Sequence, residues 1–131
     1  MSKIYLSAAF SRRDEMAQIA YKLKYMGHEI VSRWVTESQR SMQDAALMDM
    51  TDVKKADTVI VFADSQYFTD AETVPRKLLS CARMSELGAA LAYGKRLIVV
   101  GGKQNIFTEL AVNLDDTESL FQFLALEIVA A

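Results

Sequence analysis

A helix followed directly by a buried strand, over residues 83–100, constrains this chain more than any other stretch. Its first part, from Arg83, predicts a helix of about three turns, with Gly94 just past its end, where glycine is favoured. The unbroken apolar run from Leu97 to Val100 is typical of a strand covered on both faces. The stretch therefore predicts one unit of a parallel α/β sheet.

The rest of the chain repeats this alternation of strands and helices. Strands are expected at residues 3–9, 28–32, 58–62, 97–100 and 111–114, and helices at 11–26, 41–55, 83–93 and 117–129. This order implies an α/β fold with a mostly parallel five-stranded sheet between two helix layers, in a single domain of 131 residues. Ligands bind such sheets beyond the carboxyl ends of the strands. The expected binding loops are residues 7–13, 32–40, 63–80 and 101–107.

Composition and charge exclude several classes of function. The net charge is -2 and no basic stripe with interleaved aromatic residues is present, so nucleic acid is not an expected partner. The lone cysteine, Cys81, cannot form an internal disulfide, and the lone histidine, His28, has no companions for a metal site and is interpreted as structural. There is no apolar run of 18 residues and no signal-peptide core, so we expect a cytoplasmic protein without a membrane partner.

Familiar nucleotide-binding motifs are missing. The residues after the first strand, 7–13, contain no dinucleotide fingerprint, and no phosphate-cradling loop of the Gly-Lys-Ser/Thr type occurs. A Ser/His/Asp triad is also unsupported, because His28 is expected to begin a strand at the opposite edge of the sheet.

Two carboxylates are the strongest chemical signal. Glu86 shares a helix face mainly with small residues, which directs it toward a cleft; alternatively, it only complements the helix dipole. Asp49 lies on the apolar, small-residue side of its helix, where an acid needs a partner; alternatively, it is a partly solvated helix acid. Two carboxylates in different environments can divide into a nucleophile and a proton donor for cleaving a glycosidic bond. The remaining acids of this region are interpreted as solvated or capping residues: Asp44, Asp52 and Asp57.

A seat for a phosphate group is predicted after the first strand. Ser11 is expected to cap the helix there, and Arg12 and Arg13 follow it, a combination that suits a monophosphate. Arg83 and Ser85 are further candidates from the helix that carries Glu86. The alternative is that the two arginines are solvated residues of a first helical turn.

Aromatic residues near the expected binding loops are candidates for stacking on a base. Trp34 and Phe10 both follow predicted strands. The alternative for Trp34 is that it covers the edge of the core.

Three segments together resemble the nucleoside 2-deoxyribosyltransferase family, which includes deoxynucleoside 5′-monophosphate N-glycosidases. They are Ile4-Tyr5-Leu6-Ser7-Ala8-Ala9-Phe10, the helical segment 48–57 around Asp49, and Glu86-Leu87-Gly88-Ala89-Ala90-Leu91-Ala92-Tyr93-Gly94-Lys95. The resemblance spans nearly the whole chain and keeps order and spacing. Its most specific part is the Glu-Leu-Gly-x-x-Leu-x-x-Gly-Lys block.

The resemblance implies a flavodoxin-like fold and a retaining displacement. Glu86 matches the glutamate that attacks the sugar, Asp49 the aspartate that handles the proton of the leaving base, and Tyr5 the tyrosine that orients the nucleophile. Ser7, on the same strand as Tyr5, is a candidate substrate-binding residue. The implied partner is a nucleoside or nucleotide, with no metal or organic cofactor. A homodimer or higher homo-oligomer is also implied, because neighbouring subunits help complete the sites in that family.

Two departures from the transferase pattern favour either a hydrolase acting on monophosphates or a different, untested specificity. The family's transferases often carry an aspartate shortly before the nucleophile, whereas residues 79–83 contain no acid; Asp64 or Asp70 is the candidate substitute. The sequence also ends in Ala130-Ala131, without the aromatic tail that some transferases use. Two other functions stay open: a non-catalytic nucleotide-binding module, and a structural protein assembled through the apolar residues of its last helix.

Overall fold

The computed structural model describes residues 1–38, 41–63, 81–103 and 105–130. Within these residues, the strands are β1 (Lys3–Ser7), β2 (Glu29–Ile30), β3 (Thr58–Phe62), β4 (Arg96–Val100) and β5 (Val112–Leu114). The α-helices are α1 (Arg13–Tyr25), α2 (Met42–Lys55), α3 (Cys81–Ala92) and α4 (Thr117–Ala130), and the 3-10 helices are η1 (Phe10–Arg12), η2 (Arg33–Val35) and η3 (Ile106–Leu110).

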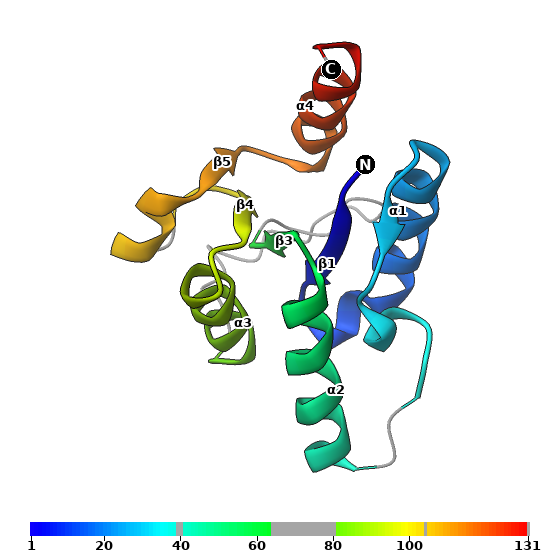
Figure 1. Ribbon diagram of the computed structural model, residues 1–131, viewed down its shortest axis with the longest axis vertical. Helices are drawn as coiled ribbons and strands as arrows, with labels where there is room; N and C mark the ends of the chain where they lie inside the picture. The colour runs from blue at the N-terminus through cyan, green and yellow to red at the C-terminus, as the bar shows by residue number, and fades with distance from the viewer. Residues whose placement is uncertain (39–40, 64–80, 104, 131) are drawn as a thin grey trace.

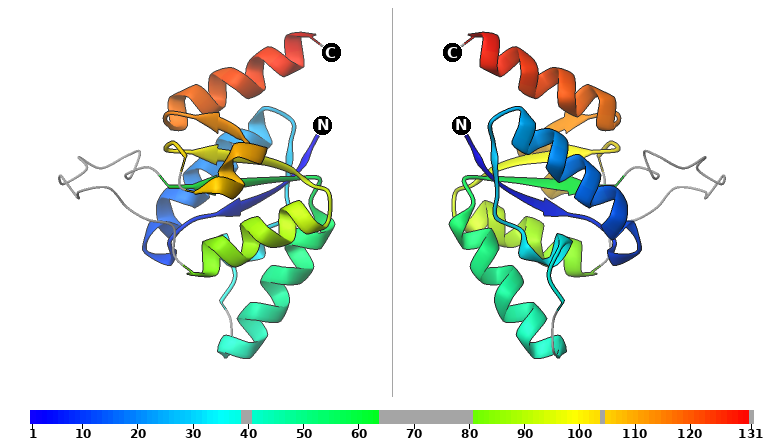
Figure 2. Two further views of the ribbon diagram at one scale, coloured as in Figure 1. Left: turned by 90° about the vertical axis from the view of Figure 1, so that its left-hand side faces the viewer. Right: turned by 90° about the vertical axis from the view of Figure 1, so that its right-hand side faces the viewer.

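The strands form one parallel sheet in the order β2-β1-β3-β4-β5. Helices α1 and α4 cover one face and α2 and α3 the other (Figure 1). In Figure 2, α4 lies on one side of the strands and α2 and α3 on the other, and the first residues of the chain lie where the strands begin. This arrangement confirms the predicted α/β three-layer sandwich, and the strand order is the flavodoxin-like one. The order reverses between β1 and β3, which makes their carboxyl ends the expected ligand site.

The central strands form the core. All five residues of β3 are buried, and Tyr5 in β1 and Ile98 in β4 are fully buried. A central strand of a parallel sheet contacts a helix layer on each face, which explains why it carries an unbroken apolar run. The predicted packing of the last helix on the sheet is confirmed for Leu120, Phe121 and Leu124, which are buried.

Several helix ends follow the predicted caps. The Ser41 side chain accepts a hydrogen bond from the Asp44 amide at 3.1 Å, and Asp116 Oδ1 accepts one from the Ser119 amide at 2.8 Å. Gly94 has a φ of 70°, the left-handed conformation expected after a helix. The predicted cap at Ser11 is wrong. The chain leaves β1 through a 3-10 turn that contains Ser11, and α1 then begins without a side-chain cap.

The segment after β2 also differs from its prediction. β2 has only two residues, and the expected polar loop contains η2, in which Trp34 and Val35 are buried. Because β2 is an edge strand that pairs only with β1, little of its length needs to be extended. No helix among the described residues has both the length and the apolar character needed to cross a lipid bilayer.

Candidate active site

Glu86 lies in the second turn of α3 and is 9% exposed. No acidic residue occurs in the first turn of this helix, so the alternative that Glu86 complements the helix dipole is wrong. A carboxylate with so little contact with water needs hydrogen-bond partners. Two residues of β1 provide them.

Tyr5 and Ser7 bind the Glu86 carboxylate from strand β1. The Tyr5 hydroxyl donates to Oε2 at 2.5 Å, and the Ser7 hydroxyl donates to Oε1 at 2.6 Å. Their side chains share one face of β1, because alternate residues of a strand point the same way. Burial raises the pKa of Glu86, while these two hydrogen bonds and the nearby charge of Arg83 oppose the increase. Burial and the Glu86 charge also raise the pKa of Tyr5, which stays a neutral donor.

Asp49 faces the same space from α2. Its Oδ1 atom is buried and has no hydrogen-bond partner among the described residues. Burial, followed by the negative charges of Glu86 and Asp52, raises the pKa of Asp49 to about 6, against a weaker opposing effect of Arg33. The two acids thus differ: Glu86 has two donors that stabilise its anion, whereas Oδ1 of Asp49 has none among the described residues, so Asp49 is the acid that more readily carries a proton.

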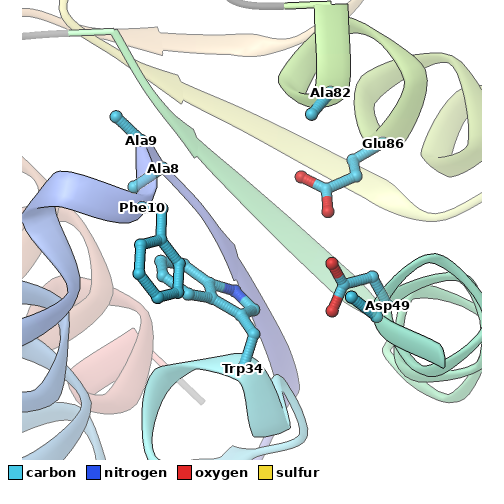
Figure 3. A pocket seen from close by; sticks show the side chains of 8 residues that line it. Ala8, Ala9, Phe10, Trp34, Asp49, Ala82 and Glu86 are labelled. Carbon is cyan, nitrogen blue, oxygen red and sulfur yellow. The ribbon is translucent and has the colours of Figure 1, made fainter. Parts of the chain in front are cut away.

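A pocket joins the two carboxylates. Figure 3 shows Asp49 and Glu86 turned toward each other, with Phe10 and Trp34 across from them. The cavity volume is about 190 Å³, many times the ~10–15 Å³ that one water molecule needs. It therefore has room for a small organic molecule. The lining residues are Ala8, Ala9, Phe10, Trp34, Ala45, Asp49, Ala82 and Glu86.

Aromatic rings form the wall opposite the acids. The ring centroids of Phe10 and Trp34 are 6.3 Å apart with a tilt of 37°. Phe10 is 64% exposed, whereas Trp34 is buried and donates from its indole nitrogen to the Leu6 carbonyl oxygen at 2.7 Å. Trp34 therefore covers the core edge and also lines the pocket, and its stacking on a base stays a prediction.

Of the arginines predicted to bind a phosphate group, Arg12 and Arg83 are buried, whereas Arg13 is partly buried and donates to the Val35 carbonyl oxygen at 3.0 Å. Arg12 forms a paired contact with Glu15, with both nitrogen–oxygen distances at 2.8 Å, and its guanidinium group lies 5.7 Å from the centre of the Phe62 ring. Arg83 donates to the Phe62 carbonyl oxygen at 2.6 Å. Burial, and then the positive charge of Arg12, lowers the pKa of Arg83. Arg83 and the Arg12–Glu15 pair thus lie at the carboxyl end of β3, and neither arginine is among the lining residues of the pocket.

The other predicted binding residues are placed less closely. Ser11 and Ser85 are exposed on η1 and α3 and are not among the lining residues of the pocket. Asp64, with most of the predicted loop 63–80, lies outside the described residues. Of the described part of the loop 101–107, no residue lines this pocket. Within the described residues, no group of three or more His, Cys, Asp or Glu side chains is arranged to hold a metal ion.

The interpretation of Asp52 as a solvated acid is wrong. Its side chain is 1% exposed and pairs with Arg33 at 2.8 Å. Asp52 lies three residues after Asp49 on α2, and this helical spacing was the available signal that the two acids share a face. The partner, Arg33, lies 19 residues earlier in the chain and could not be identified from spacing.

The site is thus a pocket at the carboxyl end of β1, between α2 and α3, with a hydrogen-bonded carboxylate, a second acid that holds a proton more readily, and an aromatic wall. Comparison of the sequence with known proteins finds no matching family model and no significant match among curated proteins. Structure comparison does find matches. CMP N-glycosidase BcmB of Clostridium botulinum has a TM-score of 0.64 at 18% identity, over 95% of this chain and 98% of that chain.

Two further solved structures share the architecture. The 2-deoxyribosyltransferase from the psychrotolerant bacterium Bacillus psychrosaccharolyticus has a TM-score of 0.64 at 20% identity, over 90% of this chain and 89% of that chain. A conserved protein from Enterococcus faecalis V583 has a TM-score of 0.54 at 16% identity, over 76% of this chain and 63% of that chain. At these identities the comparisons establish a shared fold, and the chemistry must be argued from the pocket.

Proposed function

We propose that this protein cleaves the N-glycosidic bond of 2′-deoxynucleosides or their 5′-monophosphates through a covalent intermediate on Glu86. The observation that carries the proposal is the pocket in which Glu86, held by Tyr5 and Ser7, faces Asp49. The fold shared with an N-glycosidase and a deoxyribosyltransferase supports it, as does the resemblance of the three sequence segments to that family.

The proposed reaction has two steps. In the first, a Glu86 oxygen forms a bond to C1′ of the sugar while the bond from C1′ to the base breaks. The electron pair leaves with the base nitrogen, and the base takes the proton of the Asp49 carboxyl group. In the second, water attacks C1′, gives its proton to the Asp49 carboxylate and releases Glu86. A missing 2′-hydroxyl removes an electron-withdrawing group, which makes the positively charged transition state easier to reach.

The remaining pocket residues have proposed binding roles. Phe10 and Trp34 contact the base, because their rings form the wall opposite the acids. Arg12 and Arg83 supply positive charge toward a 5′-phosphate, with Ser11 and Ser85 at the edge of this region. The neighbour whose name specifies CMP as its substrate supports testing a monophosphate. Water as the acceptor gives a hydrolase, and a second base gives a transferase.

One incubation series tests the proposal. The protein is incubated with dCMP, deoxycytidine and CMP, with and without a second free base, and products are separated by chromatography. Free cytosine that requires Glu86 supports the proposal, and a new nucleoside in the presence of the second base identifies a transferase. Absence of base release from every substrate, together with thermal stabilisation by nucleotides, would contradict the proposal in favour of a non-catalytic binding module.

A further inference from the structure

Asp52 binds the residue that precedes the aromatic wall. Its carboxylate accepts from the Arg33 backbone amide at 3.0 Å, from Nε at 3.0 and 3.1 Å, and from Nη2 at 2.8 Å. The Arg33 side chain is 41% exposed, whereas Asp52 is 1% exposed. A buried carboxylate that binds both the backbone and the planar guanidinium of one residue fixes that residue in position as well as in charge.

The residues on either side of Arg33 are fixed to β1. The Ser32 hydroxyl accepts from the Leu6 amide at 3.1 Å, and the Trp34 indole nitrogen donates to the Leu6 carbonyl oxygen at 2.7 Å. Residues 32–34 therefore connect β1 to α2, with Asp52 as their attachment on the helix. Releasing Asp52 would leave the hydrogen bond from Trp34 to Leu6 in place but would remove the attachment of Arg33 to α2.

The same pair acts electrostatically on Asp49, one turn earlier on α2. Among the described residues, four groups interact electrostatically with the Asp49 carboxyl group: Glu86 on α3, Asp52 on α2, Arg33 on η2 and Tyr5 on β1. The charges of Glu86 and Asp52 raise the pKa of Asp49, and the charge of Arg33 lowers it. The Arg33 guanidinium group forms its hydrogen bonds with Asp52 and not with Asp49.

We propose that Asp52 is a positioning residue that, through Arg33, sets the Trp34 wall and places a negative charge one helical turn from the Asp49 carboxyl group. The catalytic meaning of this role rests on the proposed function. The alternative is that the Arg33–Asp52 pair only stabilises the fold. Loss of stability alone would leave the titration of Asp49 and the exposure of Trp34 in the folded protein unchanged.

The first test is the titration of Asp49 by NMR in protein with carbon-13-labelled aspartate, with the signal assigned by its loss in Asp49→Asn. In Asp52→Asn the Asp49 midpoint is expected to fall by about half a pH unit or more, because one nearby negative charge is removed and Arg33 is released. The matched control is Asp44→Asn, an exposed acid on the first turn of the same helix, which should leave the midpoint unchanged.

The second test uses Trp34, the one tryptophan of the chain, as a fluorescent probe. Acrylamide quenching should increase in Asp52→Asn and also in Arg33→Met, which removes the guanidinium part of the contact and keeps the backbone amide. It should stay at the wild-type value in Asp44→Asn. Quenching and an Asp49 titration that both match wild type in Asp52→Asn would overturn the inference; if that variant does not fold, wild-type quenching in Arg33→Met would do so.

Activity measurements separate this inference from the proposed function. In Asp52→Asn, the decline of base release toward higher pH should begin at lower pH than in wild type. If the wild-type protein releases base and the Asp49 and Trp34 readouts are unchanged in Asp52→Asn, the proposed role of Asp52 is contradicted and the proposed function is not. Absent base release in wild type, with both readouts shifted in Asp52→Asn, would contradict the proposed function and leave the positioning of Trp34 and Asp49 supported.

Discussion

The charged residues at the amino ends of the strands differ from those at the carboxyl ends in how they are paired. At the amino ends of the strands, charges are paired: Arg96 binds Glu127 at 2.5 Å, and Asp57 accepts from the Lys3 amide at 2.9 Å and from the Thr58 hydroxyl at 2.9 Å. Glu127 and Arg96 are also partly exposed, with side-chain exposures of 40% and 32%. These charged side chains have hydrogen-bond or ion-pair partners, and those of Arg96 and Glu127 also contact water.

At the carboxyl ends, acids are gathered away from water. Glu86 receives two hydrogen bonds, but Asp49 has a buried oxygen without a partner among the described residues and faces the charge of Glu86. Both acids have raised pKa values as a result. Burying unpaired charge costs folding free energy. At the amino ends of the strands, the paired charges therefore support the fold. At the carboxyl ends, the buried acids cost folding free energy, as expected for a reactive site.

The largest expected effect comes from removing the nucleophile. Glu86→Gln keeps the shape of the side chain but removes the anion and leaves one acceptor oxygen for the Tyr5 and Ser7 hydroxyls, so base release should fall by roughly 10³-fold or more. The measurement is the initial rate of free-base formation. Glu127→Gln, at the amino-end edge, is the matched control and should retain wild-type activity. A comparable rate loss in both variants would contradict the assignment of the reaction to the carboxyl ends of the strands.

The next effect concerns Asp49. Asp49→Asn should reduce base release by about 10²–10⁴-fold, the usual contribution of a general acid, because the amide has no acidic proton to give the leaving base. Substrates whose leaving group needs no proton should be much less affected. A rate that falls equally for both kinds of substrate would contradict the assignment of Asp49 as proton donor.

The same substitution should change stability in a pH-dependent way. Because the pKa of Asp49 is raised from 3.8 to about 6 in the folded protein, its contribution to stability is fully present below about pH 3.8 and is lost as the pH rises through about 6. Relative to wild type, Asp49→Asn should therefore gain on the order of 1–3 kcal/mol between pH 4 and pH 8. Urea unfolding at both pH values measures this, and a difference independent of pH would contradict it.

A smaller effect is expected for Tyr5→Phe. The ring stays in the core, but Glu86 loses a hydrogen bond that favours its anion, so the pKa of Glu86 should rise further. Base release should fall by about 10-fold, and the loss of activity toward acidic pH should begin at higher pH than in wild type. Rates measured over the full pH range test this. An unshifted acidic limb would mean that Tyr5 does not act through Glu86.

The smallest effect is expected at the amino-end edge, for His28. This residue is buried; its Nδ1 accepts from the Ser2 amide at 3.3 Å, and its Nε2 has no hydrogen-bond partner among the described residues. Burial, followed by the charges of the N-terminal amine and Arg96, lowers the pKa of His28, against weaker effects of Glu127 and Asp57.

A lowered pKa favours the neutral form of His28 in the fold, so its contribution to stability is present above about pH 6.5 and is lost as the pH falls. The difference in unfolding free energy between wild type and His28→Asn should therefore shrink from pH 7.5 to pH 5. Activity at pH 7.5 should not change. A stability difference that grows toward pH 5 would contradict this account of the edge.

Local sequence signals were sufficient for most of the fold. β3 has the predicted bounds, Thr58–Phe62, because an apolar, β-branched run is flanked by charged residues. Ser41 and Asp116 cap their helices because the capping contacts lie within a few residues of the chain. The turn Phe10–Arg12 was missed because a capping-box pattern does not exclude a 3-10 turn at the end of a strand.

The site was predictable where residue type and spacing carry the information. Glu86 and Asp49 were identified from helix faces and from the resemblance, and Tyr5 from the resemblance. In the structure, Glu86 and Asp49 line one pocket, and Tyr5 donates a hydrogen bond to the Glu86 carboxylate. Their catalytic roles stay predictions. The burial of Asp52 was not predictable, because its partner Arg33 is distant in sequence and the contact depends on how α2 packs against η2.

The most direct measurement of the central claim is peptide mass analysis of the protein quenched with acid during turnover of dCMP. The account predicts a mass increase equal to one deoxyribosyl phosphate group on the peptide that contains Glu86, and no such increase in Glu86→Gln. A sugar adduct on a different peptide, or wild-type rates of cytosine release by Glu86→Gln, would contradict it.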